Sequence, residues 1–336
     1  MKNEIKRKHH YVWAYYLKAW SKNNNIYYMS KKGNVAFDSV YGLSCEKDFY
    51  KVSFFSDADL YIARYFANLS QEILRKLHNN LIDNIYTIQC LFNISFNIKT
   101  NTSNELKMLE NEKNKLLHNF LEDYHSDIER RNLDVLNILR TGDCSILDDK
   151  ETRWFFYYYL GFQNARTKKY KDLILWSAST IEGDASLTSL LQNFIKKHWW
   201  FMCFYFGTNF AGGISLNPQY KLLLLNNCTN EPFITSDQPI ININPLGHLS
   251  DNVDYYYPIS EKYSLLIFLS ENIGITSDIY DEEIIKDLNM KICQDAGDTI
   301  YSTSADIIEK YRVHFNTRKF KTLINSDKDN KKKSKL

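Results

Sequence analysis

The spacing of apolar residues predicts helices through the middle third of the chain. From Ser56 onward, apolar positions recur about every 3.6 residues, which is the period of an amphipathic helix with one buried face. Ser56 followed by Asp59 is a helix N-cap signal, and Thr102 followed by Glu105 has the spacing of a capping box. Asn79-Asn80 predicts a break between the first two helices. We therefore expect helical hairpins across this region.

One segment, residues 153–166, is apolar around nearly its whole circumference. This pattern predicts a central helix that is buried on most sides. Its polar exceptions, Gln163 and Arg166, are three residues apart and therefore lie on one helical face. If this face is buried, the cation on it needs a partner.

Short apolar runs predict strands near both ends of the chain. Residues 26–30 and 34–37 flank a Lys-Lys-Gly turn and predict a hairpin, and residues 49–54 are a further candidate strand. The other predicted strands are 222–225, 233–235, 240–243, 255–257, 265–269 and 300–302. Additional helices are expected at 9–20, 185–200, 282–295 and 305–312.

These elements define a fold class. Few helical segments separate the strands, so antiparallel pairing is the simplest layout. The predicted fold is α+β, with a largely helical middle and a mostly antiparallel sheet built from the N-terminal hairpin and the C-terminal strands. The hydrophobic content of 44% supports a single globular domain over residues 1–324. The lysine-rich residues 325–336 are expected to be a disordered tail.

Composition narrows the class of protein. Tyr (24) outnumbers Phe (20), and tyrosines suit a groove in which the ring packs while the hydroxyl meets a polar partner. The six cysteines lack zinc-site spacing and are expected to be reduced and mostly buried. No apolar stretch has the length of a membrane span or the pattern of a signal peptide. We expect a cytoplasmic protein with no membrane partner.

Positive charge is concentrated at the two ends. Residues 318–336 carry a net charge of +6 and residues 1–10 a net charge of +3, which leaves the body at about −7. Affinity for nucleic acid scales with clustered cations. Binding of a nucleic acid or nucleotide partner through such clusters would therefore use the ends of the chain.

Asp237 is the first candidate for chemistry. It lies in Phe233–Ile240, where one short apolar run ends in Ser-Asp-Gln-Pro and a second begins. As a turn residue, Asp would bond its own backbone next to a proline that fixes the following dihedral angle. As a functional residue, a carboxylate at the end of a strand could hold a divalent metal or act as a general base.

The histidines His9 and His10 are further candidates, because imidazole titrates near neutrality and binds divalent metals. In a helix, adjacent residues point about 100° apart, so only one of the two would face a common site. The alternative is a structural pair, one of which bonds to a backbone carbonyl.

Arg166 and Gln163 could bind a phosphate or carboxylate, for which guanidinium geometry is suited. The alternative is a buried ion pair of Arg166 with Asp237 or Glu46 that stabilises the fold. No Walker-type loop, dinucleotide-binding fingerprint, nucleophile elbow or zinc-protease motif occurs in the chain. The chain therefore lacks the usual sequence signatures of the common nucleotide-binding and hydrolase families.

Several stretches resemble the uncharacterised, mainly bacterial family catalogued as domain of unknown function 4238. The resemblance spans residues 8–302. Trp13 stands where that family has Pro, and Gln238 where it usually has Asn. The family's chemistry is not established, so the resemblance implies positions and no reaction. The stretches that carry it are His10–Trp20, Glu46–Tyr50, Gln163–Thr167, Phe233–Ile240, Tyr257–Ser260 and Asn289–Ser302.

Two hypotheses from different classes follow. The first is a hydrolase or nuclease that acts on a phosphate-containing substrate, with a divalent metal as candidate cofactor. Its catalytic residues would be His10, Glu46 and Asp237. Its substrate-binding residues would be Arg166, Gln163 and His9. The second is a non-enzymatic binding or scaffold module whose Tyr-rich groove and basic termini engage a partner. A solvent-open pocket that reaches Asp237 favours the first, and a sealed polar network favours the second.

Overall fold

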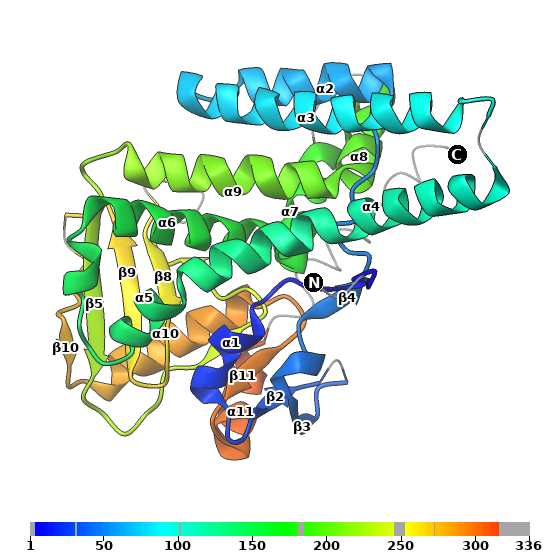
Figure 1. The fold of residues 1–336 in the computed structure, drawn as a ribbon. Helices are drawn as coiled ribbons and strands as arrows, with labels where there is room; N and C mark the ends of the chain where they lie inside the picture. Colours follow the sequence, from blue (N-terminus) through cyan, green and yellow to red (C-terminus); the bar gives the residue numbers. More distant parts are fainter. Residues whose placement is uncertain are drawn as a thin grey trace, which may run out of the picture.

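Helices from the middle of the chain cover one side of the β-sheets in the computed structural model (Figure 1). The structure describes residues 4–30, 32–100, 102–180, 185–244, 253–271 and 273–315. The predicted α+β class, with a helical middle and mostly antiparallel sheets, is confirmed. The helices of the middle are α2 (Asp57–Asn68), α3 (Glu72–Phe96), α4 (Ser103–Arg131), α5 (Leu133–Leu139), α6 (Lys150–Ala165), α7 (Lys168–Ser179), α8 (Ala185–Lys197) and α9 (Trp199–Ser215).

The predicted N-cap at Ser56 and the predicted capping box at Thr102 are both present, and Ser56 also forms a capping box. The side chains of Ser56 and Thr102 each accept a hydrogen bond from the backbone N–H three residues on, and their own backbone N–H groups donate to the carboxylates of Asp59 and Glu105. The helices α2 and α4 therefore begin where predicted. The predicted break at Asn79-Asn80 is wrong, because these residues lie within α3. Asn79 donates its side-chain amide to the Arg75 carbonyl, and Asn80 is exposed, so the polar face of α3 accommodates both.

The most extensive helix pairing joins α6 to α9. The predicted buried helix at 153–166 is confirmed, although it begins earlier, at Lys150. The helices touch at two glycines: a Cβ built on Gly161 would lie 2.2 Å from the Gly207 carbonyl oxygen. Glycine is therefore required for this close backbone approach. The helix predicted at 185–200 is in fact two helices, α8 and α9, because the chain turns at His198.

The strands form three sheets. The N-terminal hairpin, β2 (Asn25–Met29) and β3 (Val35–Ser39), pairs with β11 (Ile300–Ser302) and β6 (Thr235–Ser236) in a four-stranded antiparallel sheet. A five-stranded sheet has the order β10-β5-β9-β8-β7 and is antiparallel except between β10 and β5. The bounds of its strands are β5 (Lys221–Asn227), β7 (Ile241–Asn242), β8 (Tyr255–Pro258), β9 (Tyr263–Phe268) and β10 (Asp278–Ile279).

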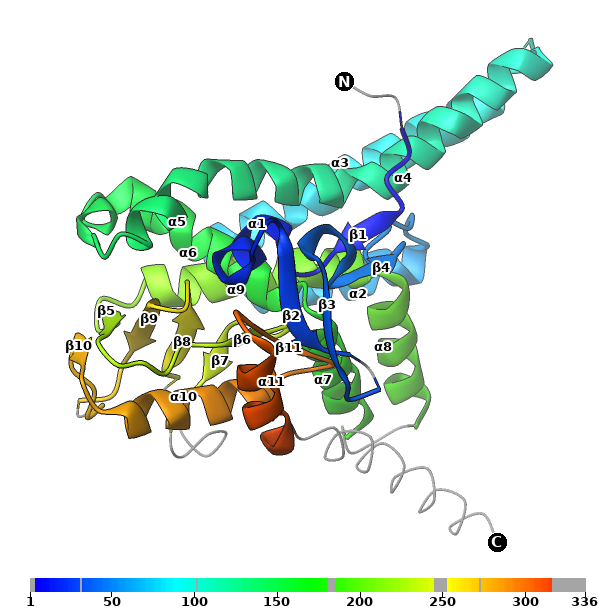
Figure 2. The same ribbon diagram turned by 90° about the horizontal axis from the view of Figure 1, so that it is seen from below.

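Both faces of the five-stranded sheet are buried. Figure 2 shows this sheet between the helices of the middle and α10 (Glu282–Asp295). Tyr257 and Leu265 pack with the α6–α9 core, whereas their neighbours Tyr256 and Leu266 pack with α10. Successive side chains of a strand point to opposite faces, so the continuous apolar runs of β8 and β9 suit this position. A last helix, α11 (Ala305–Tyr311), follows β11.

The N-terminal segment differs from its prediction. The helix expected at 9–20 begins only at α1 (Ala14–Leu17), which continues as a 3₁₀ turn to Trp20. Residues Lys8–His10 form a short strand, β1, which pairs with β4 (Cys45–Lys47). The strand predicted at 49–54 is absent from this described segment, because the pairing lies further upstream in β4. In residues 8–10, pairing with β4 therefore determined the conformation, although the spacing of the aromatic residues is helical.

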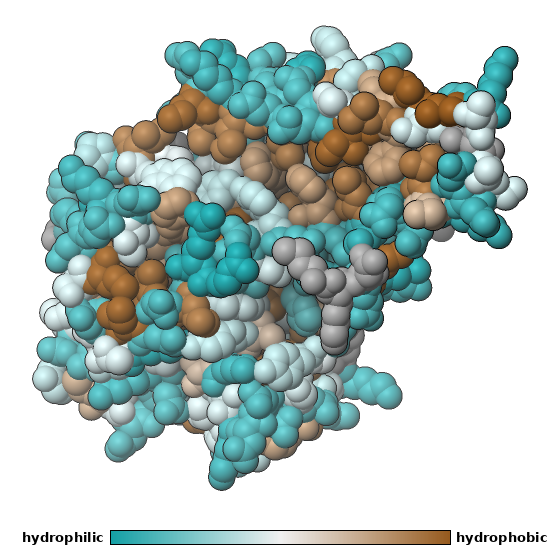
Figure 3. All heavy atoms as spheres, in the orientation of Figure 1, coloured by the Kyte–Doolittle hydropathy of each residue, from teal (hydrophilic) through white to brown (hydrophobic). Residues whose placement is uncertain are grey.

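The hairpin formed by α3 and α4 carries exposed apolar side chains on its surface. Leu91 and Ile94 of α3 and Met108 of α4 are each more than half exposed. Figure 3 shows apolar side chains gathered between α3 and α4 on one face, and Figure 2 shows this hairpin projecting past the sheets. None of the described helices is long and apolar enough to cross a membrane. The tail predicted at 325–336 lies outside the described residues.

All six cysteines are free, but only Cys203 and Cys293 are buried. The prediction of reduced thiols therefore agrees with the structure, whereas the prediction that most are buried is wrong. Cys228 is exposed, and the other three are partly buried.

Candidate functional site

Asp237 lies at the turn after β6 and is 2% exposed. Its Oδ1 accepts a hydrogen bond from the Gly297 N–H at 2.8 Å, and its Oδ2 accepts one from the Asp298 N–H at 2.7 Å. Burial raises the pKa of this carboxyl to about 6, although the backbone hydrogen bonds act to lower it. The carboxylate therefore fixes the loop after α10 and is shielded from solvent.

Arg166 follows α6 and is 2% exposed. Its Nη2 lies 2.5 Å from Oε1 of Glu129 on α4 and also donates to Gln163 Oε1 at 3.0 Å. The predicted proximity of Gln163 and Arg166 is thus present. The expected ion-pair partners, Asp237 and Glu46, are wrong, because α4 packs on α6 and places Glu129 opposite the guanidinium.

Gln163 ties the N-terminal segment to α6. Its Nε2 donates to the Tyr11 carbonyl at 3.2 Å, and its Oε1 accepts a weaker hydrogen bond from the Trp13 N–H at 3.4 Å. With Arg166 on the same oxygen, the carboxamide is engaged on both sides. These contacts give Gln163 a structural function that needs no ligand.

His9 is fully buried in β1. Its Nδ1 accepts the Tyr50 N–H at 3.2 Å, and its Nε2 lies 3.0 Å from the His118 carbonyl and 3.1 Å from the Lys6 carbonyl. Nε2 therefore carries the proton, and the imidazole is neutral. Burial lowers its pKa, which agrees with this state. His9 is the histidine of the pair that bonds to backbone carbonyls.

His10 and Glu46 lie nearer the surface. The His10 side chain is 26% exposed, and its Nδ1 is 3.8 Å from Oε1 of Glu122 on α4. Glu46 is exposed on β4, directly opposite His9 in the β1–β4 ladder. Glu122 also accepts a hydrogen bond from the Tyr50 hydroxyl. Of the predicted site residues, these two are therefore the most accessible.

The six predicted residues divide into two groups. Gln163, Arg166 and the two histidines lie around α4 and its carboxylates. Asp237 and Glu46 lie near the buried hydroxyl of Tyr11, whose pKa is raised first by burial and then by their charges. Among the described residues, no hydrogen bond or ion pair joins one group's side chains to the other's. The catalytic assignment stays a prediction.

The space beside Arg166 does not accept a ligand. It is enclosed by Glu129, His125 and Tyr159, among others, and has no room for a water-sized molecule. Both ring nitrogens of His125 lack a hydrogen-bond partner there. Burial lowers the pKa of His125 well below its usual value, so the ring is neutral. This network is sealed.

A cavity of about 320 Å³ opens instead beside Gln238, the neighbour of Asp237. Gln238 donates from Nε2 to Asn164 Oδ1 at 2.8 Å and to the Ile240 carbonyl at 3.0 Å, and its Oε1 accepts from the Thr167 hydroxyl. These bonds join the end of α6 to the segment between β6 and β7. The cavity lies at this junction.

The cavity has aromatic walls. Tyr170 of α7, Phe210 of α9 and Tyr255 of β8 line it, and the rings of Phe210 and Tyr255 are 4.5 Å apart. Burial raises the pKa of Tyr170 and of Tyr255, so both phenols are neutral donors. Neither hydroxyl hydrogen-bonds to another described residue.

The sequence pointed to two of the cavity residues without identifying the cavity. Asn164 lies between Gln163 and Arg166 in one family-like stretch, and Gln238 follows Asp237 in another. The other walls include residues 240–242 and Tyr255, which lie in predicted strands, and residues of α7 and of the later part of α9, which were not predicted as helices. In the part of the chain that the structure describes, no three His, Cys, Asp or Glu side chains are grouped so as to hold a metal ion.

Comparison with known proteins agrees with the resemblance seen in the sequence. The family model described as "Protein of unknown function (DUF4238)" matches residues 8–306. No curated protein and no solved structure matches the chain. The matched range includes Asn164 and Gln238, which line the cavity, as well as the Arg166 and Asp237 networks. The chain therefore belongs to the DUF4238 family.

Proposed function

We propose that the protein is a non-enzymatic binding module that holds a small, uncharged heteroaromatic compound, such as a nucleobase, in the cavity beside Gln238. The observation that carries this proposal is a cavity of about 320 Å³ at which two family-like stretches meet. Ligand pockets range from about 300 to 1,000 Å³. A cavity at the lower end of that range suits a compound of one or two rings.

The walls of the cavity supply both kinds of contact that a planar polar ring needs. Tyr170, Phe210 and Tyr255 offer aromatic surface for stacking. The phenol hydroxyls and the amide nitrogens of Asn164 and Asn242 have no hydrogen-bond partner among the described residues. A ligand with carbonyl or ring-nitrogen acceptors would satisfy these donors.

The charges of the lining favour a neutral ligand. Lys169 and Asp295 are the two charged residues at the cavity, and they form an ion pair with each other. The Lys169 ammonium also donates to the Asp295 carbonyl. Because this cation is already engaged, the cavity offers little to a phosphate group.

The hydrolase hypothesis has less support from the contacts. The pKa of Asp237, at about 6, would suit a general base near neutrality. However, both of its oxygens accept backbone N–H groups, and the carboxylate is buried. Catalysis by Asp237 would first require the loop at Gly297 to open. We therefore assign the accessible cavity to binding.

The test is calorimetric titration of the full chain with adenine, uracil and their nucleosides. Leu173 lines the cavity from α7, so Leu173→Trp should fill it and abolish binding while the melting temperature stays similar. Tyr255→Phe should weaken binding by about tenfold through the loss of one hydrogen bond. Tyr220→Phe is the matched control, since Tyr220 stacks on Tyr255 but does not line the cavity.

The outcomes separate the alternatives. Binding that persists in Leu173→Trp, or that weakens equally in Tyr255→Phe and Tyr220→Phe, would place the ligand elsewhere. Turnover of a nucleoside or nucleotide that is lost in Asp237→Asn would instead support the hydrolase hypothesis. If no compound of this class binds, the proposal is wrong.

A further inference from the structure

One edge of the five-stranded sheet is unpaired along most of β5. On one side, β9 pairs with β5 from Lys221 to Asn226. On the other side, β10 pairs only with Asn226 and Asn227, and Figure 1 shows it beside one end of β5. Among the residues that the structure describes, residues 222–224 therefore have a strand neighbour on one side only. An open strand edge of this kind is a template for pairing with another chain.

The hydrogen-bond pattern shows which backbone groups face the open edge. The Asn226 N–H donates to the Ser277 carbonyl on the β10 side. The backbone groups of alternate residues point to the same edge of a strand, so those of Leu222 and Leu224 also face that side. No hydrogen bond from another described residue reaches them there. Leu222 and Leu224 thus present two N–H donors and two carbonyl acceptors in a row.

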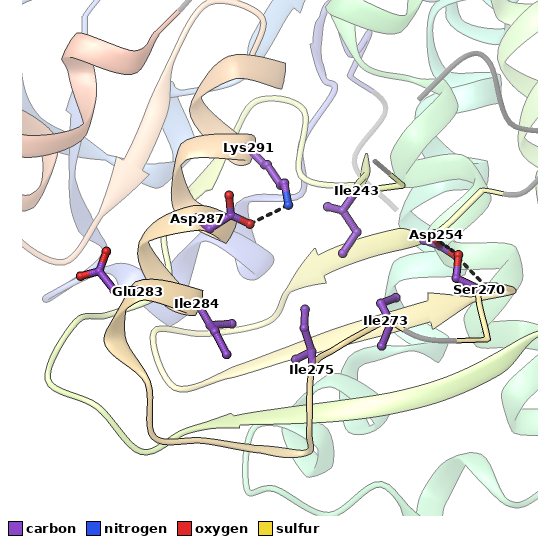
Figure 4. Close-up of a pocket in the computed structure, with 9 residues that line it drawn as sticks. All are labelled: Ile243, Asp254, Ser270, Ile273, Ile275, Glu283, Ile284, Asp287 and Lys291. Carbon is purple, nitrogen blue, oxygen red and sulfur yellow. Dashed lines mark hydrogen bonds and ion pairs between the residues drawn. The ribbon is translucent and has the colours of Figure 1, made fainter. Parts of the chain in front are cut away.

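The segment before β10 leaves this edge open because it packs against the face of the sheet instead. Gly274 has a φ of +68°, a left-handed conformation that turns the chain. Ile273 and Ile275 pack with the apolar cluster beneath α10, and Figure 4 shows them pointing into the same space as Ile284 of that helix. Burial of these isoleucines therefore holds the segment away from residues 222–224.

A cavity of about 480 Å³ lies along the open edge, and we call it the β5 slot. Residues 222–224 line it on one side, and residues 141, 142 and 144 of the loop after α5 line it on another. The leucines at 222–224 are partly exposed, whereas Leu225, next along the strand, is fully buried. At the β10 end, the Oδ1 atom of Asn226 is buried without a hydrogen-bond partner. The slot therefore combines apolar side chains with unpaired polar groups.

We propose that the β5 slot binds an extended peptide segment of another protein, which adds a strand antiparallel to β5 and in line with β10. The peptide residues opposite Leu222 and Leu224 would each exchange both backbone hydrogen bonds with their partner. Antiparallel pairing is the more stable arrangement per residue. A compact ring or a hydrocarbon would fill the space but leave the row of donors and acceptors unpaired.

The side chains along β5 define the sequence of such a peptide. Directly opposite residues in an antiparallel pair lie on the same face, so apolar peptide residues should face Leu222 and Leu224. Lys221, at the start of β5, is exposed and forms no ion pair with a described residue. An acidic peptide residue opposite Lys221 would complement its charge. Because residues 141–144 wall the slot, a single narrow strand fits it better than the edge of a folded sheet.

The experiment is fluorescence anisotropy of the full chain with a labelled peptide, Thr-Val-Thr-Val-Glu-amide. In the antiparallel register its valines lie opposite Leu224 and Leu222, and its glutamate lies opposite Lys221. N-methylation of both valines removes the two donors that face β5 and should weaken binding by at least about tenfold. N-methylation of both threonines is the matched control, because their N–H groups face away from β5, and binding should persist. Equal losses for the two modified peptides, or no binding of the unmodified one, would overturn the proposal.

Two variants locate the site. Leu222→Pro removes an N–H that faces the slot and makes no bond to β9, so the sheet should persist while binding weakens by about tenfold or more. Leu222→Val keeps the N–H and is the control, with circular dichroism to check the fold of both. Should Leu222→Pro unfold, Lys221→Glu provides a second test, since it should reverse the preference toward the same peptide ending in lysine. An unchanged preference in Lys221→Glu would contradict the assigned register.

Hydrogen exchange distinguishes a peptide from a second copy of the chain. The N–H groups of Leu222 and Leu224 should exchange faster than that of Leu223, which faces β9, and the peptide should slow them. If they are instead protected without peptide, in a dimer that Leu222→Pro abolishes, a second copy occupies the edge and the proposal is wrong. Leu173→Trp, which fills the cavity beside Gln238, should leave peptide binding unchanged, so this proposal and the proposed function fail independently.

Discussion

Arg166 and Glu129 form an ion pair at 2.5 Å although their side chains are only 3% and 13% exposed. Burial raises the pKa of the Glu129 carboxyl against the effect of the pairing. Burial also acts to lower the pKa of Arg166, but Glu129 outweighs it and the pKa of Arg166 is raised. Each charge therefore depends on the other, and the pair fixes α4 against the end of α6.

Removing one partner should be strongly destabilising. Glu129→Ala leaves a guanidinium buried without a carboxylate, which costs about 3–5 kcal/mol in the free energy of unfolding. Asp127→Ala, on the same helix, is the control, because its pairs with Arg130 and Arg131 are exposed. Loss of these exposed pairs should cost less than about 1 kcal/mol. Urea unfolding of the two variants measures the difference, and similar losses would contradict the dependence of Arg166 on Glu129.

Stability should depend on pH through Asp237. Its pKa is raised to about 6, so between pH 4 and 6 the folded protein keeps a proton that the unfolded chain has released. This contribution to stability is present below about pH 4 and is lost as the pH rises through 6. A shift from 3.8 to about 6 corresponds to roughly 3 kcal/mol.

Asp237→Asn isolates this contribution. The free energy of unfolding of the unmodified protein, relative to that of Asp237→Asn, should fall by roughly 3 kcal/mol between pH 4 and pH 7. Chemical unfolding at several pH values measures it. A difference that stays constant or rises over this interval would show that the hydrogen bonds from Gly297 and Asp298 outweigh the burial of the carboxylate.

The contact of α6 with α9 makes opposite predictions for two glycines. Gly161→Ala would place a Cβ 2.2 Å from the Gly207 carbonyl oxygen, so the helices must separate, and we expect a loss of about 1–3 kcal/mol or more. Gly213→Ala in α9 meets nothing within 4 Å. It should stabilise the protein by up to about 1 kcal/mol, because alanine favours the helix. Melting temperatures that shift in the same direction would be inconsistent with this packing.

The start of α2 allows a graded test of capping. Ser56→Ala removes one cap and should cost about 1 kcal/mol. Asp59→Ala should cost more, because Asp59 caps Ser56, pairs with Lys197 and lies 3.3 Å from Nε2 of His198. Thermal unfolding ranks the two variants. If Ser56→Ala proved the more damaging, the contacts of α2 with the turn between α8 and α9 would carry little energy.

Local signals in the sequence were enough to predict much of the fold. The Ser56 and Thr102 caps, the hairpin at β2–β3, and the bounds of α10 followed from short-range rules that tertiary contacts did not override. The N-terminal strand β1 could not be predicted in this way. It forms through pairing with β4, about 40 residues away, and helical spacing carries no information on such partners.

The candidate site was predictable only in part. That Gln163 and Arg166 would share a face followed from their spacing, but the choice of Glu129 as partner depends on how α4 packs against α6. The spacing of apolar residues indicates which face of a helix is buried, but it does not indicate which residue of a neighbouring helix contacts that face. The cavity beside Gln238 depends on α7 and on the extension of α9, two elements whose aromatic stretches do not distinguish helix from strand.

The pairing of β2 with β11 has a consequence for biosynthesis. Tyr28 is opposite Tyr301 in this ladder, and the Thr299 hydroxyl bonds to the Met29 carbonyl across a separation of 270 residues. Closing so long a loop is slow, and domains emerge from the ribosome N-terminus first. One edge of the hairpin β2–β3 therefore stays unpaired until residues 300–302 have been translated. During this interval the free edge of β2 is a site at which another chain could pair.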